Sequence, residues 1–193
     1  MPGDFSDYGG DEGTSSSDDF GDDYDNDSDD FGEGGRVGLE TRSEIRWPML
    51  RQFCIFLENR VGSLNDLLRT IERHDLRIVA LSIVDSADFA VVRLILDDTD
   101  RARELFDLSG RNYFENDLIG VLLPDAPQPY LDLCLCLLGA ELNIHYTYPL
   151  NFRRENRGTI AIHVDDLDQA ATVLEEGGHT LISESDLRDG DGY

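Results

Sequence analysis

The chain has 193 residues, with 41 Asp and Glu against 16 Lys and Arg, so its formal net charge is −25 and every basic residue is an arginine. Nucleic acids and anionic membrane surfaces bind dense cationic patches, so the composition predicts neither as a partner. No stretch approaches the ~18 consecutive apolar residues of a membrane span.

The amino terminus, MPGDFSDYGG, lacks the basic and apolar regions of a signal peptide. Cys54, Cys134 and Cys136 lie inside apolar runs and form neither a CxxC pair nor an even disulfide framework. Free cysteines in such runs behave as small apolar side chains. Together these features predict a cytoplasmic protein.

Residues 1–43 are predicted to be a disordered acidic tail. Residues 1–35 hold 13 acids and no base, and an acid-Phe-small-acid pattern occurs in them three times. The three copies are Asp4–Asp7, Asp19–Asp22 and Asp30–Glu33. Two interpretations stay open, because the single aromatics could bind weakly in a partner's groove or the segment could simply be a solubilising tail.

The folded part is expected to begin near Ile45, with the element order strand, helix, strand, strand, helix, strand. The expected elements are a strand at 51–57, a helix from Ser63, a strand at 76–84, a turn at 86–88, a strand at 89–96, a helix opened by Asp97 and Asp98, and a strand at 113–123. Ser63, with Asp66 three residues later, is the expected helix cap. Leucine and isoleucine recur after it at the spacing of one helical face.

The second half of the chain repeats the first. Residues Leu64, Leu67, Leu68 and Ile71 align with Tyr130, Leu133, Cys134 and Leu137 at an offset of 66. The segment from Asp97 to Ala102 aligns with Asp165 to Ala170 at an offset of 68, and Asn116–Leu118 with Ser185–Leu187 at an offset of 69. Because identities and apolar spacing agree over four elements, the sequence predicts an internal duplication.

The duplication predicts an α+β fold of two ferredoxin-like βαββαβ units, at 48–116 and 117–188, after the disordered tail. Each unit is a four-stranded antiparallel sheet with both helices on one face. A unit of about 70 residues is marginally stable alone. We therefore expect the two units to lie side by side and to behave as one rigid body.

The residues at the first strand–helix junction resemble the opening of an ACT domain. Glu58-Asn59-Arg60-Val61-Gly62-Ser63-Leu64 follows a strand, and Asp75-Leu76-Arg77-Ile78 follows the helix. Pro124–Pro129, with Leu142–Ile144, resembles the same element in the second copy. The resemblance covers about residues 50–188. It is closest to tandem ACT proteins described as acetolactate synthase-like regulatory proteins.

The resemblance implies a non-catalytic sensor of amino acids, linked to acetolactate synthase and branched-chain amino-acid biosynthesis. ACT domains bind the ligand where the strand–helix loop of one unit meets a neighbouring unit. A helix N-terminus suits a carboxylate, and a glycine lets the backbone approach it closely. The alternative is that glycine relaxes a turn and serine caps a helix without any ligand. The expected ligand-binding residues are Asn59, Gly62, Ser63, Leu64 and Asp125.

The second loop departs from the family pattern. Gln128 stands where the family has glycine, and Pro129 fills the first helical position, where proline is favourable. A side chain at position 128 would hinder close backbone approach to a ligand. One site per chain, at the first loop, is therefore expected.

The helix expected at 130–138 is apolar on all sides except at Asp132. An all-round apolar helix must be covered by something. Tyr130, Leu133, Cys134 and Leu137 are expected to face the sheet, which leaves Leu131, Leu135 and Cys136 for a partner. The expected partner is a second copy or a larger enzyme. The alternative function is a ligand-free interaction module that docks through residues 130–138 and the acidic tail.

No residue pattern predicts an enzyme, a cofactor or a metal site. The four histidines have no metal-ligand spacing, and the Asp pairs at 97–98 and 165–166 open helices, where Asp is a favoured cap. Gly190-Asp191-Gly192 matches the start of a thiamine diphosphate motif but lacks the downstream Asn. If the acetolactate synthase link holds, this chain is expected to be the regulatory partner.

Overall fold

The helices and strands of the computed structural model follow the order expected from the sequence, over the described residues 47–58, 60–85 and 89–189. The first half contains β1 (Leu50–Glu58), α1 (Ser63–Arg73), β2 (Ile78–Asp85), β3 (Phe89–Leu96), α2 (Thr99–Leu108) and β4 (Tyr113–Leu122). The second half contains α3 (Pro129–Gly139), β5 (Ile144–Arg154), β6 (Arg157–Val164), α4 (Leu167–Glu176), β7 (Leu181–Ile182) and α5 (Glu184–Arg188). The acidic tail and the turn expected at 86–88 lie outside the described residues.

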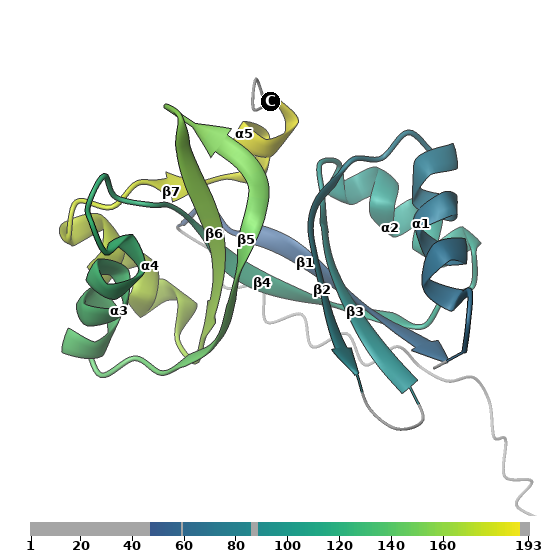
Figure 1. The fold of residues 1–193 in the computed structure, drawn as a ribbon, viewed down its shortest axis with the longest axis horizontal. Helices are drawn as coiled ribbons and strands as arrows, with labels where there is room; N and C mark the ends of the chain where they lie inside the picture. The colour runs from purple at the N-terminus through teal and green to yellow at the C-terminus, as the bar shows by residue number, and fades with distance from the viewer. Residues whose placement is uncertain (1–46, 59, 86–88, 190–193) are drawn as a thin grey trace, which may run out of the picture. The chain divides into compact units, whose positions relative to one another are not determined.

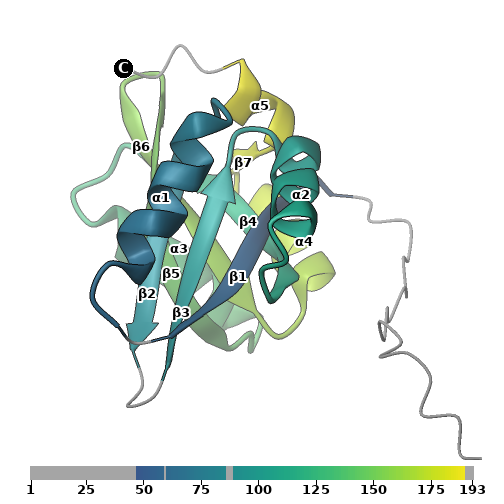
Figure 2. The ribbon, with the colours of Figure 1, turned by 90° about the vertical axis from the view of Figure 1, so that its right-hand side faces the viewer.

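The first sheet has the strand order β2-β3-β1-β4, with antiparallel neighbours. Alternate residues of a strand point to opposite faces of the sheet. On β1, Phe53, Ile55 and Leu57 therefore face α1 and α2, which lie across this side of the sheet (Figure 2), and form a core with Leu67 and Phe106 of those helices.

Strand β4 belongs to both units. Its first part, from Tyr113 to Leu118, pairs with β1, while Ile119 to Leu122 pair with β6. Strand β7 pairs with β4 at Gly120 and Val121, which gives the second sheet the order β5-β6-β4-β7. Helices α3 and α4 cover one face of that sheet (Figure 1). The predicted pair of βαββαβ units is confirmed.

Gly120 lies where β1 gives way to β7 along the same side of β4. A Cβ at this position would be 2.6 Å from Leu50 Cδ1 and 3.1 Å from the backbone oxygen of Ile182. The first distance is shorter than real Cβ contacts and the second is unusually tight, so a residue without a side chain allows β4 to pair within both sheets here.

A third core joins the two units through the faces of the sheets that carry no helix. Leu50 and Ile95 of the first sheet pack with Tyr148, Leu150 and Phe152 of β5. The described residues accordingly belong to one compact unit. The two units lie side by side through the shared strand β4, as expected. They also pack face to face, because this removes the apolar residues of both sheet faces from water.

Gln52 forms hydrogen bonds with two tyrosines at this inter-sheet core. The fully buried Gln52 accepts a hydrogen bond from the Tyr148 hydroxyl at 2.6 Å and donates to the Tyr146 hydroxyl at 3.0 Å. The Arg93 guanidinium lies 3.9 Å from the centroid of the Tyr146 ring. Because a buried amide costs free energy unless it is hydrogen-bonded, these contacts specify how the two sheets meet.

The segment Ser185–Leu187, aligned in the sequence with strand residues Asn116–Leu118, is helical instead. It lies in α5, whose N-terminus is closed by a capping box between Ser183 and Asp186. A serine with an acid three residues later favours a helix start, and this local signal outweighs the distant alignment. The last strand of the second unit is correspondingly short, at Leu181–Ile182.

The acid pairs cap helices, as predicted. Asp98 accepts a hydrogen bond from Arg101 N at 3.1 Å, and Asp166 accepts one from Gln169 N at 2.9 Å. The prediction for Ser63 is wrong: the N-cap of α1 is Gly62, and Ser63 is the first helical residue. The Ser63 hydroxyl instead accepts a hydrogen bond from Arg60 Nε at 3.2 Å.

Helix α3 is rotated from the expected orientation, and Tyr130, expected to face the sheet, is 46% exposed. Leu133 and Leu137 are buried as predicted, but Cys136 also packs against the core of the second unit, while Cys134 is exposed. The Cys136 thiol lies 3.4 Å from the carbonyl oxygen of Val173 in α4, so contact with that helix decides the rotation of α3. No helix in the described part of the chain is long and apolar enough to span a membrane.

Candidate functional site

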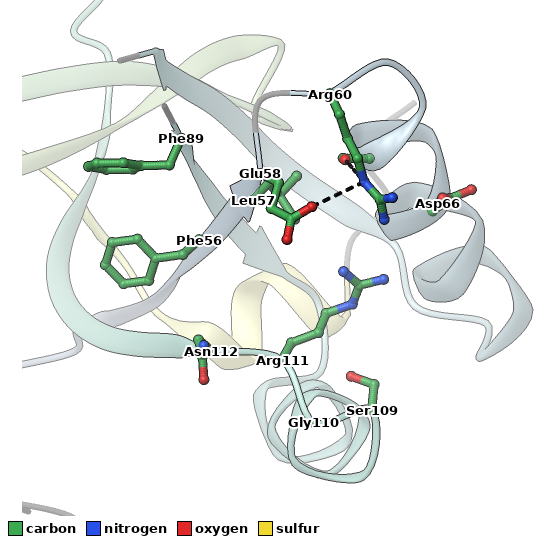
Figure 3. Close-up of a pocket in the computed structure, with 11 residues that line it drawn as sticks. Phe56, Leu57, Glu58, Arg60, Asp66, Phe89, Ser109, Gly110, Arg111 and Asn112 are labelled. Atoms are coloured by element: carbon green, nitrogen blue, oxygen red, sulfur yellow. Dashed lines mark hydrogen bonds and ion pairs between the residues drawn. The ribbon is translucent and has the colours of Figure 1, made fainter. Parts of the chain in front are cut away.

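A surface pocket of about 560 Å³ lies where β1 ends and α1 begins, beside the loop from α2 to β4 (Figure 3). Its volume is in the range of small-molecule sites. The lining residues are Phe56, Leu57, Glu58, Arg60, Ser63, Asp66, Phe89, Ser109, Gly110, Arg111 and Asn112.

The backbone at the start of α1 depends on Gly62. Its φ of 97° lies in the left-handed region, which residues with a side chain rarely adopt. Gly62 makes no side-chain cap, and its carbonyl accepts the hydrogen bond of Asp66 N at 2.9 Å. Ser63 N also donates to the carbonyl oxygen of Arg60 at 3.3 Å. The N–H groups between Ser63 and Asp66 have no carbonyl one turn earlier to bind, so this end of the helix favours an anion.

Charges of both signs surround the pocket. Arg60 Nε lies 3.4 Å from a carboxylate oxygen of Glu58, and Asp66 lies in the first turn of α1. The side chain of Arg111 extends from the α2–β4 loop toward Glu58 and Arg60 (Figure 3). A free amino acid also carries one charge of each sign, so two cations and two anions suit its zwitterionic head group.

The Nε atom of Arg111 is buried and has no hydrogen-bond partner among the described residues. A buried donor without an acceptor costs about 1–3 kcal/mol. A ligand oxygen placed against this nitrogen would recover that free energy.

The structure brings together some of the residues predicted for the site. Ser63 lines the pocket, and Gly62 precedes it in the chain. Leu64 packs against the core of the first unit, Asn59 lies outside the described residues, and Asp125 lies exposed on a bend of the second unit, outside the pocket lining. Their roles in ligand binding stay predictions.

Of the lining residues, only Ser63 was among the predicted site residues, and Arg111 is one of those that the sequence did not indicate. It follows Ser109 and Gly110, a pair that indicates a helix end and not a binding site. About fifty residues separate it from Arg60. The two meet because antiparallel pairing of β1 with β4 puts the end of β1 beside the start of β4.

The second strand–helix loop has a different backbone. Gln128, the counterpart of Gly62, has φ −132° and ψ 64° and makes no side-chain cap. Pro129 opens α3 directly after it. The left-handed turn that shapes the first loop is therefore absent at Gln128.

Two histidines on the neighbouring strands β5 and β6 meet at the edge of the inter-sheet core. The ring centroids of His145 and His163 are 5.2 Å apart, and Tyr146 stacks on His163 at 4.8 Å. Burial, together with His145 and Arg93, holds the pKa of His163 below its ordinary value. Within the described ranges no three His, Cys, Asp or Glu side chains gather in a way that could hold a metal ion.

Comparisons with known proteins agree with this fold. Protein BT0572 from Bacteroides thetaiotaomicron has 27% sequence identity and a TM-score of 0.67, over 72% of this chain and 96% of that one. The regulatory subunit of aspartate kinase from Thermus thermophilus has 10% identity and a TM-score of 0.48, over 69% and 95% of the two chains. The agreement in fold therefore rests on the first of these two structures. No curated protein matches the sequence.

A family model described as "ACT domain pair" matches residues 49–189. That range takes in β1 and α5 and all the elements between them. ACT domain pairs are typical of amino-acid-sensing regulatory proteins and are not catalytic. The chain belongs to the ACT domain pair family.

Proposed function

We propose that this chain is a non-catalytic regulator that binds a free amino acid in the pocket at the start of α1. The observation that carries the proposal is the buried, unpartnered Nε of Arg111, in a pocket that also contains a helix N-terminus and the carboxylate of Asp66. The ligand carboxylate would accept hydrogen bonds from Arg111 and the first turn of α1. Its ammonium group would lie against Asp66.

The first test is thermal denaturation of the full chain with each of the twenty amino acids. A ligand that binds the folded state stabilises it by about 2.7 kcal/mol at a hundred times its Kd. We expect at least one amino acid to raise the melting temperature, and Arg111→Gln to abolish that rise. The matched control is Arg69→Gln on the exposed side of α1, which should keep it.

Two further variants separate the predicted site residues. Asn59→Ala should weaken binding if the first loop holds the head group, whereas Asp125→Asn should leave binding unchanged if the first loop is the single site. A melting temperature unaffected by every amino acid, with or without a partner enzyme, would contradict the sensor proposal.

The link to acetolactate synthase and branched-chain biosynthesis is the finer part of this proposal. It is supported by the resemblance of the segments 58–64 and 124–129 to tandem ACT regulators of that type. It predicts that valine, leucine or isoleucine gives the largest thermal shift. It also predicts that the chain changes the activity of the host's acetolactate synthase when the two are mixed; a shift with other amino acids alone would exclude this link.

The alternative is an interaction module, favoured by the exposed face of α3. Tyr130, Leu131, Leu135 and Leu138 are between 46% and 68% exposed there. Patches of large apolar side chains exposed to water are a feature of docking surfaces. Leu135→Lys should prevent capture of a partner enzyme while leaving amino-acid binding intact. Capture that is equally efficient in this variant would exclude α3 as the docking surface.

A further inference from the structure

The pocket at the start of α1 has a polar end and an aromatic end. The groups of the polar end belong to Arg60, Ser63, Asp66 and Arg111. The aromatic end is formed by the rings of Phe56 and Phe89, which lie apart from these groups in Figure 3. The head group of an amino acid accounts for the polar end alone, so the aromatic end needs a function of its own.

The two rings of the aromatic end come from neighbouring strands and contact each other. Phe89 of β3 is the strand partner of Glu58, which points to the same face of β1 as Phe56. The ring centroids of Phe56 and Phe89 are 6.2 Å apart, and the side chains are 46% and 45% exposed. Together they offer a half-open apolar surface beside the polar end.

A third ring, that of Phe114, lies beside Phe56 but outside the pocket. Its centroid is 5.7 Å from that of Phe56, and the side chain is 43% exposed. Phe114 is not among the residues that line the pocket. The three rings therefore resemble one another in exposure, and only Phe56 and Phe89 adjoin the groups that would hold a head group.

The charges beside the aromatic end disfavour an ionised ligand side chain. Glu58 lies directly opposite Phe89, so an acidic side chain over the rings would meet a like charge. A carboxylate oxygen of Glu58 lies 3.4 Å from Arg60 Nε, so a basic side chain would have to compete with that guanidinium. An apolar side chain meets neither obstacle, and it removes ring surface from water.

We infer that Phe56 and Phe89 bind the side chain of the ligand and make the site selective for apolar amino acids, branched or aromatic. This selectivity rests on the proposed amino-acid binding, because the head group must lie at the polar end for its side chain to reach the rings. Aromatic rings accept both kinds of side chain, since they pack against aliphatic groups and form edge or offset contacts with another ring.

The size of the selectivity follows from the apolar contact that a ligand makes. One missing methylene weakens binding in a hydrophobic pocket by about 10- to 200-fold. Because both rings are half exposed, the lower end of this range applies to the whole side chain. Leucine and phenylalanine should therefore bind about tenfold more tightly than glycine. Aspartate and lysine should bind no more tightly than glycine.

The experiment follows the melting temperature of the full chain against the concentration of leucine, phenylalanine, glycine, aspartate and lysine, which gives a Kd for each. Phe56→Ser and Phe89→Ser should each weaken leucine binding about tenfold. Both should leave glycine binding unchanged, because glycine has no side chain to contact the rings. The matched control is Phe114→Ser, which removes a ring of similar exposure outside the pocket and should bind leucine as the wild type does.

The outcomes separate this selectivity from the proposed function. If aspartate or lysine binds the wild type more tightly than leucine and phenylalanine, the selectivity is overturned while amino-acid binding stands. The same follows if both pocket variants bind leucine as the wild type does, or if Phe114→Ser loses as much affinity as they do. If no amino acid changes the melting temperature of the wild type, both proposals fail. Circular dichroism checks the fold of each variant, and the comparison of ligands on the wild type requires no variant.

Discussion

The two units share one plan but differ where the chain enters the first helix. Gly62 turns through the left-handed region, whereas Gln128 has a negative φ of −132° and is followed by a proline. The pocket lies at the first junction, and its lining includes no residue of the second unit. Duplication thus preserved the packing of the helices and sheets, while the backbone at the two junctions differs.

The units also end differently. The first closes with the ten residues of β4, and the second closes with the two residues of β7 followed by α5. Glu184 of α5 accepts hydrogen bonds from Arg51 N at 3.0 Å and from Thr99 Oγ1 at 2.9 Å. Because β7 is short, the residues after it form α5, and the hydrogen bonds of Glu184 link this helix of the second unit to the first unit.

The largest effect is expected from Phe106→Ala in the core of the first unit. Phe106 is fully buried and its ring packs at 5.2 Å from that of Phe53. Loss of the ring should lower the free energy of unfolding by about 3–5 kcal/mol. Because the units share β4, both should unfold in one transition at a lower denaturant concentration.

Two probes distinguish the units in that experiment. Trp47, the one tryptophan of the chain, packs against the core of the second unit, and far-ultraviolet circular dichroism follows both. Coincident transitions are expected in wild type and variant. A fluorescence transition that stays in place while the dichroism transition moves would show that the units unfold separately.

Gln52→Ala tests the contact between the units. It removes the acceptor of the buried Tyr148 hydroxyl, and an unsatisfied buried group costs about 1–3 kcal/mol. The control is Tyr148→Phe. In a double-mutant cycle by urea denaturation, the two losses should be less than additive, because both changes remove the same hydrogen bond. Full additivity would mean that this bond does not join the units energetically.

Gly62→Ala and Gln128→Gly test the difference between the two loops. An alanine held at φ 97° should lower the free energy of unfolding by about 1–2 kcal/mol. No atom lies within 4 Å of a Cβ there, so the loss comes from the backbone angle alone. Gln128→Gly should cost about 0.5–1 kcal/mol, through chain entropy. If thermal denaturation shows that the two variants lose the same free energy of unfolding, the difference between the two loops is contradicted.

Acid should weaken the second unit through two histidines. The pKa of His163 lies below the ordinary 6.5 because of burial, His145 and Arg93; that of His179 is lowered by burial, against the opposing charge of Asp132. The unfolded chain then binds protons more readily than the folded one below pH 6.5, so stability is complete above that pH and falls beneath it.

His163→Gln should flatten this pH dependence between pH 7 and 5, measured as the denaturant midpoint. His74→Gln is the control, because His74 lies exposed at the end of α1, where its Nδ1 contacts the carbonyl of Thr70. A midpoint that falls as steeply in the His163 variant as in wild type would exclude this histidine as the cause.

Local signals in the sequence sufficed for most of the fold. The apolar spacing around Leu67 and Ile71 predicted α1, and the paired acids at 97–98 and 165–166 predicted two helix starts, because caps depend on residues within one turn. Predictions from local signals were wrong where other contacts decide. The rotation of α3 depends on its packing against α4. The N-cap of α1 is Gly62, whose backbone angle suits that position, and not Ser63.

The sequence by itself determined the duplication, the element order and the loop at which a ligand is expected, since all three depend on spacing along the chain. Only the tertiary structure decided that the helix-free faces meet around Gln52, that Arg111 reaches the start of α1, and that three phenylalanines stay open to solvent. These features depend on which strands become neighbours in the sheets. Strand pairing brings together residues that are distant along the chain, so the local sequence around each residue does not indicate its partner.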